Sequence, residues 1–174
     1  MGEHRLCKAG VEGSIPFVSI SAGPAGPVVA PAGPGAREVR MRMAADHVTG
    51  LASRGDFETW AARRGSFAAA ALLIVDVVGL KRVNREQGFL AGDAVLEAAA
   101  TRLRTAAVGA DLVARLGGDE LVAIFPTPTA AENALRSLSA GPDDPPLRVG
   151  LVRARADDTR ESLIERLYAT VRSC

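Results

Sequence analysis

The chain has 174 residues and a formal net charge of +1, so it is long enough for one globular domain and a tail, and no overall field favours nucleic acid or an anionic membrane as a partner. With 48% hydrophobic and 24% charged residues, its composition is typical of a soluble globular protein. The two cysteines and two histidines are isolated, which argues against a zinc site, and the longest apolar run, residues 67–78, is too short to span a bilayer. We therefore expect a cytoplasmic protein.

Residues 1–42 do not have the composition of a folded domain. Between positions 22 and 35 nearly every second residue is Gly or Pro, which removes backbone donors and raises the entropy cost of ordering the chain. We expect a disordered tail here and a domain over residues 43–174. A further hypothesis is an over-extended gene start, because residues 11–19 resemble the translated end of a tRNA gene; Met41 or Met43 would then be the natural start.

From residue 43 onward the hydrophobic pattern is periodic. The apolar run 69–77 has strand length and predicts a buried central strand. Two short strands around Gly117 and Gly118 predict a hairpin, in which we expect the glycines to adopt positive φ. The order of elements predicts an α/β fold of the α+β type, with a central, mostly antiparallel sheet and flanking helices. Residues 46–62 predict a turn followed by an amphipathic helix, with Phe57, Trp60 and Ala61 on one face. Further helices are predicted over 91–107, 129–139 and 160–172, and the remaining strands over 111–116, 120–125 and 147–152.

Acidic residues stand at the ends of two predicted strands. Asp76 closes the apolar strand, and Asp119 and Glu120 lie at the tip of the hairpin. If these strands are neighbours, the carboxylates converge at one edge of the sheet, where a hard cation such as Mg²⁺ would neutralise them. The alternative is that they are solvated acids in turns.

Groups suited to a nucleotide follow Asp76. The backbone amides of Gly79, Leu80 and Lys81 lie in a strand-to-helix loop, where they can bind phosphate, and Lys81 adds a positive charge. Asn84 and Asp93 offer an amide and a carboxylate that suit the edge of a guanine. Taken individually, Asn84 fits a surface helix position and Asp93 a helix cap.

Three groups of motif residues follow one another in unbroken order. They are Asp46-His47-Val48-Thr49-Gly50-Leu51; Asp76 with Lys81-Arg82-Val83-Asn84, Gly88 and Gly92-Asp93; and Arg115-Leu116-Gly117-Gly118-Asp119-Glu120-Leu121. Together they resemble the successive signatures of the GGDEF diguanylate cyclase family. The resemblance extends from about residue 46 to 125 and continues weakly to Tyr168. It implies a fold similar to class III adenylyl cyclases and polymerase palm domains.

The resemblance also implies roles for these residues. Asp76, Asp119 and the carbonyl of Val77 would hold Mg²⁺ or Mn²⁺, and Glu120 would act in activating the 3′-hydroxyl or in binding metal. Gly117 and Gly118 would let the backbone approach the nucleotide. The amides of Gly79, Leu80 and Lys81 would bind the phosphates of GTP, and Asn84 and Asp93 would read its guanine. Two subunits, each with one GTP, would face each other as a homodimer and form cyclic di-GMP with release of pyrophosphate.

Several positions depart from the family pattern. Val78 stands where a second acid is common, and Leu121 replaces the final Phe of the motif. Family members usually carry a phosphate-clamping Lys three residues after the tyrosine, where this chain has Val171, with Arg172 next. The C-terminus is therefore shortened relative to the pattern.

Two hypotheses about function remain open at this point. One is a Mg²⁺-dependent diguanylate cyclase. The other is a degenerate GGDEF domain that binds GTP or a protein partner without turnover. No sensor module is recognisable in the sequence, so a separate sensor protein is the expected source of any input signal.

Overall fold

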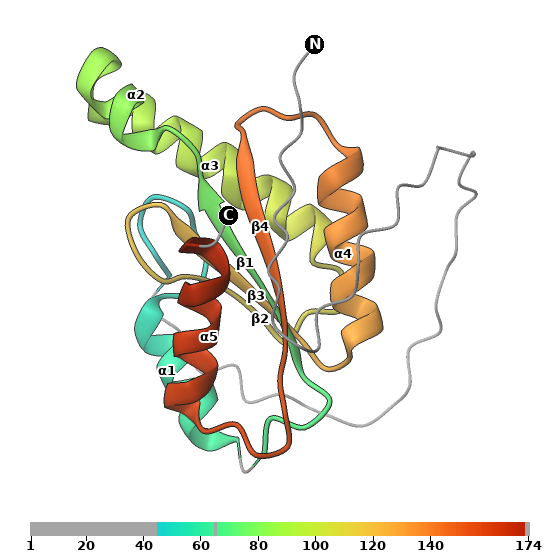
Figure 1. The fold of residues 1–174 in the computed structure, drawn as a ribbon. Helices are drawn as coiled ribbons and strands as arrows, with labels where there is room; N and C mark the ends of the chain where they lie inside the picture. The colour runs from blue at the N-terminus through green and yellow to red at the C-terminus, as the bar shows by residue number, and fades with distance from the viewer. Residues whose placement is uncertain (1–44, 65, 173–174) are drawn as a thin grey trace.

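The structure is a computed structural model that describes residues 45–64 and 66–172 (Figure 1). The predicted tail over residues 1–42 lies outside this part of the chain, as do both cysteines and the side chains of Val171 and Arg172. None of the helices in the described ranges is both long and apolar enough to cross a lipid bilayer.

A single antiparallel sheet organises the described residues. Its strand order is β2-β3-β1-β4, which places β1 in the interior between β3 and β4. All five residues from 71 to 75 have no exposed surface, as expected for a strand covered on both faces. The predicted mostly antiparallel sheet is therefore confirmed. The strands are β1 Ala71–Val77, β2 Leu112–Arg115, β3 Glu120–Phe125 and β4 Leu147–Arg153.

Helices cover both faces of the sheet. One face carries α1 (Arg54–Arg63) and α5 (Arg160–Arg172), and the other carries α3 (Phe89–Ala106) and α4 (Pro128–Ala140). Helix α2 (Leu80–Gln87) and the start of α3 extend past the sheet, toward the upper left of Figure 1.

Alternate residues of β1 supply the two cores. Leu73 and Val75 pack among the buried residues of α3 and α4, whereas Leu72 and Ile74 pack with those of α1 and α5. Helix α5 comes close to β4 because Gly150 has no side chain: an added Cβ would lie 2.5 Å from the side chain of Thr170. The packing of α5 against this strand fixes that helix above the sheet.

Helix α2 is a separate element whose bounds the sequence pattern did not give. The sequence indicated a strand-to-helix loop over residues 77–81, a surface helix position for Asn84 and a helix beginning at residue 91; the chain is helical from Leu80 and again from Phe89, with Gly88 at a φ of 88° between them. Helix α2 has only eight residues and buries only Leu80, so its pattern is too short to set bounds.

The hairpin between β2 and β3 was predicted correctly, but for the wrong reason. Neither Gly117 nor Gly118 has a positive φ. Instead, Arg115 donates from Nε to the carbonyl of Gly117 (3.1 Å) and from Nη2 to the carbonyl of Gly118 (2.8 Å). A side chain, rather than left-handed backbone, therefore shapes this turn.

The central strand is expected to dominate the free energy of unfolding. Leu73→Ala should cost about 2–5 kcal/mol, because it leaves a cavity in a fully buried site. Leu90→Ala removes the same atoms from a residue that is 87% exposed and should cost no more than about 0.5 kcal/mol. Urea unfolding followed by circular dichroism measures both. Equal losses for the two variants would contradict this account of the core.

Candidate functional site

Strand register brings the predicted carboxylates to one edge of the sheet. Asp76 on β1 is the cross-strand partner of Glu120 on β3. The amide of Val77 donates to the carbonyl of Asp119 at 3.0 Å, which holds the hairpin turn beside the end of β1. Only 17% of the Asp76 side chain is exposed, so it is not the solvated turn acid of the alternative interpretation.

Burial and mutual repulsion act on these acids together. The pKa of Asp76 is raised above its usual value, first by burial and then by the negative charge of Asp119. The pKa of Glu120 is raised by burial and by the charges of Asp119 and Asp76. The concentration of negative charge at this edge thus opposes ionisation of Asp76 and Glu120, which favours a bound cation.

Cations from three elements partly offset this repulsion. Arg148 on β4 is the cross-strand partner of Asp76, and its Nη1 lies 3.5 Å from Oδ2 of Asp76. Lys81 at the start of α2 also lowers the pKa of Asp76. Arg54 on α1 acts in the same direction on Glu120.

Helix α5 contributes a hydrogen bond to the same edge. The hydroxyl of Tyr168 donates to the Glu120 carboxylate, and this bond lowers the pKa of that carboxyl. The sequence indicated Tyr168 only as a landmark for the phosphate clamp, and it did not indicate Arg148 at all. Cross-strand register is the signal that would have identified Arg148, since the partner of Asp76 on β4 follows from the β1–β4 alignment.

The turn before α1 supports the hairpin. Asp46 accepts from the amide and the hydroxyl of Thr49, and Arg115 Nη1 donates to both of its carboxylate oxygens, at 3.0 and 3.2 Å. These bonds lower the pKa of Asp46 against the opposing effect of its burial. Since Arg115 also holds the carbonyls of Gly117 and Gly118, Asp46 fixes the guanidinium that shapes the turn next to Asp119.

The loop after Asp76 has the geometry of an anion-binding helix start. Gly79 caps α2 with a φ of 81°, a left-handed conformation that glycine adopts without strain. The amides of Leu80 and Lys81 are the first two of the helix and so have no acceptor within it. An added Cβ at Gly79 would meet no atom within 4 Å, so the loop is open on that side.

Asn84 lies against the helix that carries Asp93. An added Cβ at Gly92 would fall 1.7 Å from Oδ1 of Asn84, so only glycine admits this contact between α2 and α3. The contact brings Asn84 to the turn of α3 that carries Asp93, and both side chains are half-buried. Two side chains can bind the same guanine edge only if they lie close together, and Asn84 and Asp93 meet this condition.

The donor atoms at this edge suit Mg²⁺ or Mn²⁺ rather than zinc. Asp76 and Asp119 supply carboxylates, and Val77 supplies a carbonyl at the same strand end. Mg²⁺ usually takes one or two carboxylates and completes its shell with water and substrate phosphates. Among the described residues, no three His, Cys, Asp or Glu side chains cluster as a metal site, so an all-protein cage is not formed there.

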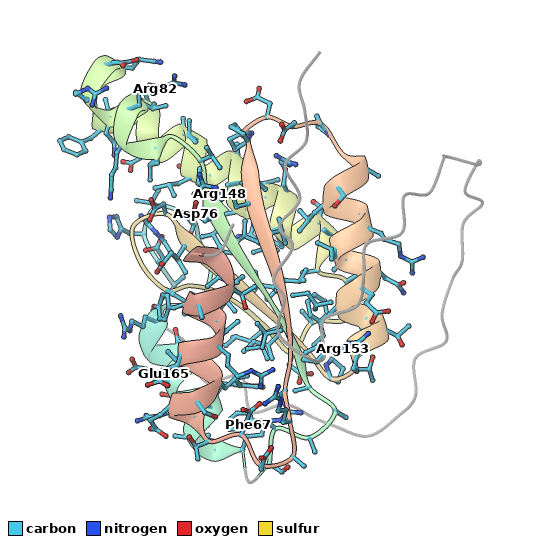
Figure 2. All side chains as sticks on the ribbon, viewed as in Figure 1. Phe67, Asp76, Arg82, Arg148, Arg153 and Glu165 are labelled. Atoms are coloured by element: carbon cyan, nitrogen blue, oxygen red, sulfur yellow. The ribbon has the colours of Figure 1, made fainter. Side chains whose placement is uncertain are left out.

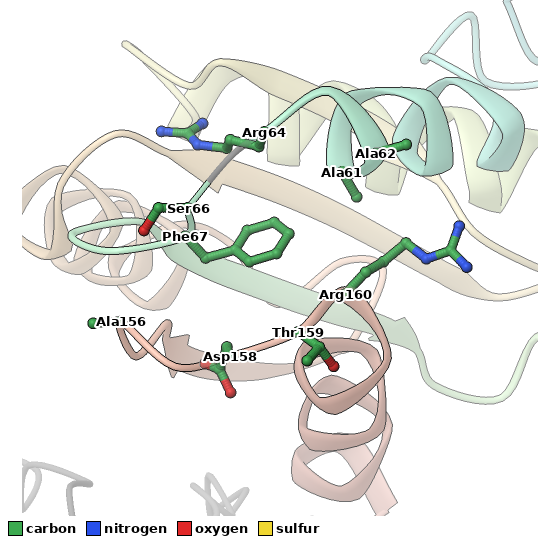
Figure 3. Close-up of a pocket in the computed structure, with 9 residues that line it drawn as sticks. All are labelled: Ala61, Ala62, Arg64, Ser66, Phe67, Ala156, Asp158, Thr159 and Arg160. Carbon is green, nitrogen blue, oxygen red and sulfur yellow. The ribbon is translucent and has the colours of Figure 1, made fainter.

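An open pocket lies elsewhere on the domain. It measures about 340 Å³ and is lined by residues from the end of α1, the segment before β1 and the start of α5 (Figure 3). Phe67, one of its lining residues, lies at the opposite end of the sheet from Asp76 (Figure 2). None of the predicted site residues lines this pocket.

Comparisons with known proteins agree with these features. The family described as "Diguanylate cyclase, GGDEF domain" matches residues 43–140. An uncharacterised protein of Mycobacterium tuberculosis is 39% identical over 104 residues, which are 57% of this chain and 17% of that protein. Diguanylate cyclase DgcP of Pseudomonas aeruginosa is 32% identical over 140 residues, 78% of this chain and 17% of DgcP. The chain thus spans about a sixth of the length of these relatives.

A solved structure shares the fold. The GGDEF domain of DgcB from Caulobacter crescentus, in complex with c-di-GMP, superposes with a TM-score of 0.64 at 23% identity, covering 78% of this chain and 92% of that one. An antiparallel sheet with helices on both faces makes this an α+β domain. The chain belongs to the GGDEF family.

The stability of the domain is expected to depend on ionisation of Glu120. Its pKa is raised in the folded protein, so its contribution to stability is fully present below the unfolded value and is lost as pH rises through the folded one. Glu120→Gln should therefore melt at a higher temperature than wild type near pH 7 in EDTA, and the gap should close toward about pH 4. The exposed Glu97→Gln is the control and should show no such trend. A Glu120→Gln variant less stable than wild type at neutral pH would contradict this.

Proposed function

We propose that this domain is a diguanylate cyclase that joins two GTP molecules into cyclic di-GMP with release of pyrophosphate, using Mg²⁺ or Mn²⁺ across a homodimer. The observation that carries the proposal is the convergence of Asp76, Asp119 and Glu120 beside the open loop at Gly79. The GGDEF family and the DgcP relative support the same reaction. GTP as substrate implies a cytoplasmic location.

Asp76, Asp119 and the carbonyl of Val77 are the proposed metal ligands. When bound there, the ion would supply Lewis-acid activation and offset the charge that develops at phosphorus. Glu120 accepts the proton of the 3′-hydroxyl of one GTP, whose oxygen attacks the α-phosphorus held by the other subunit. The bond to pyrophosphate breaks as the new phosphodiester forms.

The remaining residues bind and orient GTP in this proposal. The amides of Gly79, Leu80 and Lys81 bind phosphate oxygens, with the Lys81 charge adding to the dipole of α2. Asn84 and Asp93 recognise guanine. Because Gly117 and Gly118 have no side chains, the backbone of the turn beside Asp119 can approach the nucleotide closely. At Gly117 a Cβ would lie 3.1 Å from Glu120 Oε2, so glycine at this position also avoids a close contact with the Glu120 carboxylate.

A second candidate function is a non-catalytic domain that binds GTP or a protein partner, including a separate sensor protein. The favouring observations are Val171, where the family pattern has a phosphate-clamping lysine, and Val78, where it often has a second acid. Val171 would weaken phosphate binding and Val78 would weaken metal binding. The acids proposed for the chemistry, Asp76, Asp119 and Glu120, are all retained.

Asp119→Ala tests the catalytic proposal. Purified protein fused to a dimeric coiled coil should convert GTP to cyclic di-GMP with Mg²⁺, as read by chromatography, and Asp119→Ala should give no product. Its melting temperature should not fall, because the hydrogen bond from Val77 uses the backbone of Asp119 and a repulsive charge is removed. Asp157→Ala, an exposed acid, is the control and should keep full activity. Wild type that binds GTP without turnover, even when dimerised, would favour the non-catalytic candidate.

In the GGDEF family, an RxxD motif shortly before the hairpin glycines binds the product, cyclic di-GMP, and inhibits the enzyme. We expect this product inhibition to be absent here. Asp111 holds the acid position of that motif, but the arginine position is occupied by Val108, which is 81% exposed. Asp111 is instead paired with Arg64, whose Nη1 lies 2.9 Å from Oδ2. The bidentate guanidinium that would bind a product phosphate is therefore missing from this motif. Calorimetry should detect no micromolar binding of cyclic di-GMP; binding that is lost in Asp111→Asn would contradict this.

A further inference from the structure

Arg148 is a cation at this edge that neither the sequence motifs nor the proposed mechanism uses. Register places it directly across from Asp76, on the face of the sheet that α5 covers. Cross-strand partners in an antiparallel pair project to the same side, about 5 Å apart. Figure 2 shows the two labelled side chains together at the end of β1.

The contact between Arg148 and Asp76 is loose. The Nη1 to Oδ2 separation of 3.5 Å exceeds the usual length of a charged N–H···O bond. The Arg148 side chain is 48% exposed, against 17% for Asp76. A guanidinium has five donors in a planar fork, so most of its capacity remains available to a ligand at this edge.

The backbone around Arg148 is fixed relative to the loop at Gly79. The amide of Val78, the residue before Gly79, donates to the carbonyl of Pro146 at 3.0 Å, two residues before Arg148. Arg102 on α3 donates to the carbonyl of Pro145. The start of β4 is therefore attached both to the proposed phosphate loop and to α3, and Arg148 extends from an anchored position.

We propose that Arg148 binds the triphosphate of the nucleotide, and that it pairs with Asp76 only while the site holds no nucleotide. The inference rests on the proposed function. Asp76 would be the carboxylate for which Arg148 competes with a divalent ion; with Mg²⁺ and GTP bound, Arg148 would leave Asp76 and its guanidinium would pair with phosphate oxygens. Arg148 would then supply, from β4, a positive charge for which the family pattern uses a lysine near position 171.

The proposal predicts that the affinities for Mn²⁺ and for GTP change in opposite directions when Arg148 is replaced. Arg148→Gln removes the competitor of the metal, so Mn²⁺ alone, followed by electron paramagnetic resonance, should bind more tightly than to wild type. The same variant should bind GTP with Mg²⁺ about tenfold or more weakly by calorimetry, because a charged hydrogen-bond donor to phosphate is lost. A purely structural ion pair would not move the two affinities in opposite directions.

Two further variants sharpen the test. Arg148→Lys keeps the charge but loses the planar fork, so it should restore competition with Mn²⁺ and recover only part of the affinity for GTP. Arg82→Ala removes an exposed cation from α2, on the same side of the domain (Figure 2), and should change either affinity by no more than about twofold. Melting temperatures within a few degrees of wild type would show that each variant is folded.

The outcomes distinguish this inference from the function on which it rests. Wild type that binds Mn²⁺ and GTP, together with an Arg148→Gln variant of unchanged affinities, would overturn the role of Arg148 and leave the cyclase proposal standing. Wild type that binds neither Mn²⁺ nor GTP would overturn both.

Discussion

The pairing of β1 with β3 is the constraint on which the candidate site depends. In this register Asp76 faces Glu120, and Leu72 and Ile74 of the same strand face Ile124 and Val122. A slip of one residue would turn Asp76 toward α3 and α4 and move Leu73 out of its core. The two hydrophobic cores therefore hold the carboxylates in place, because such a slip would exchange the side chains that the two cores receive from β1.

Placing acids at the end of so buried a strand has an electrostatic cost that the rest of the edge reduces. Burial raises the pKa of both Asp76 and Glu120, and Arg148, Lys81, Arg54 and Tyr168 act against that rise. Six elements contribute to this balance: β1, β3, β4, α1, α2 and α5. Repulsion between these acids lowers the stability of the domain when no ligand is bound, and the same repulsion favours binding of a cation. Many binding sites lose stability for function in this way.

Most of the architecture could be predicted from the sequence, because local hydrophobic periodicity and turn residues indicate most of its elements. The apolar run that became β1, the hairpin around Gly117 and Gly118, and the helix face of Phe57 and Ala61 were all recovered in the structure. The bounds of helix α2 could not be predicted, since an eight-residue helix with one buried residue gives too short a pattern. Strand register brought Asp76 and Glu120 together, but the pairings of Asp76 with Arg148 and of Asp46 with Arg115 depend on long-range register, which no local pattern contains. The assumed positive φ of the hairpin glycines failed because a guanidinium satisfies that turn instead.

The attachment of α5 to β4 through Gly150 sets an order of events during synthesis. Tyr168 follows Glu120 along the chain and leaves the ribosome roughly 2–10 s later at about 5–20 residues per second. In that interval the hairpin and β1 can already pair, while Asp76 and Glu120 still face water rather than the end of a helix. Glu120 then lacks its hydrogen bond from Tyr168, which it gains only when the nascent helix packs over Gly150. A ribosome-bound chain without α5 would thus carry the motif residues in register and lack the hydrogen bond that α5 gives to Glu120.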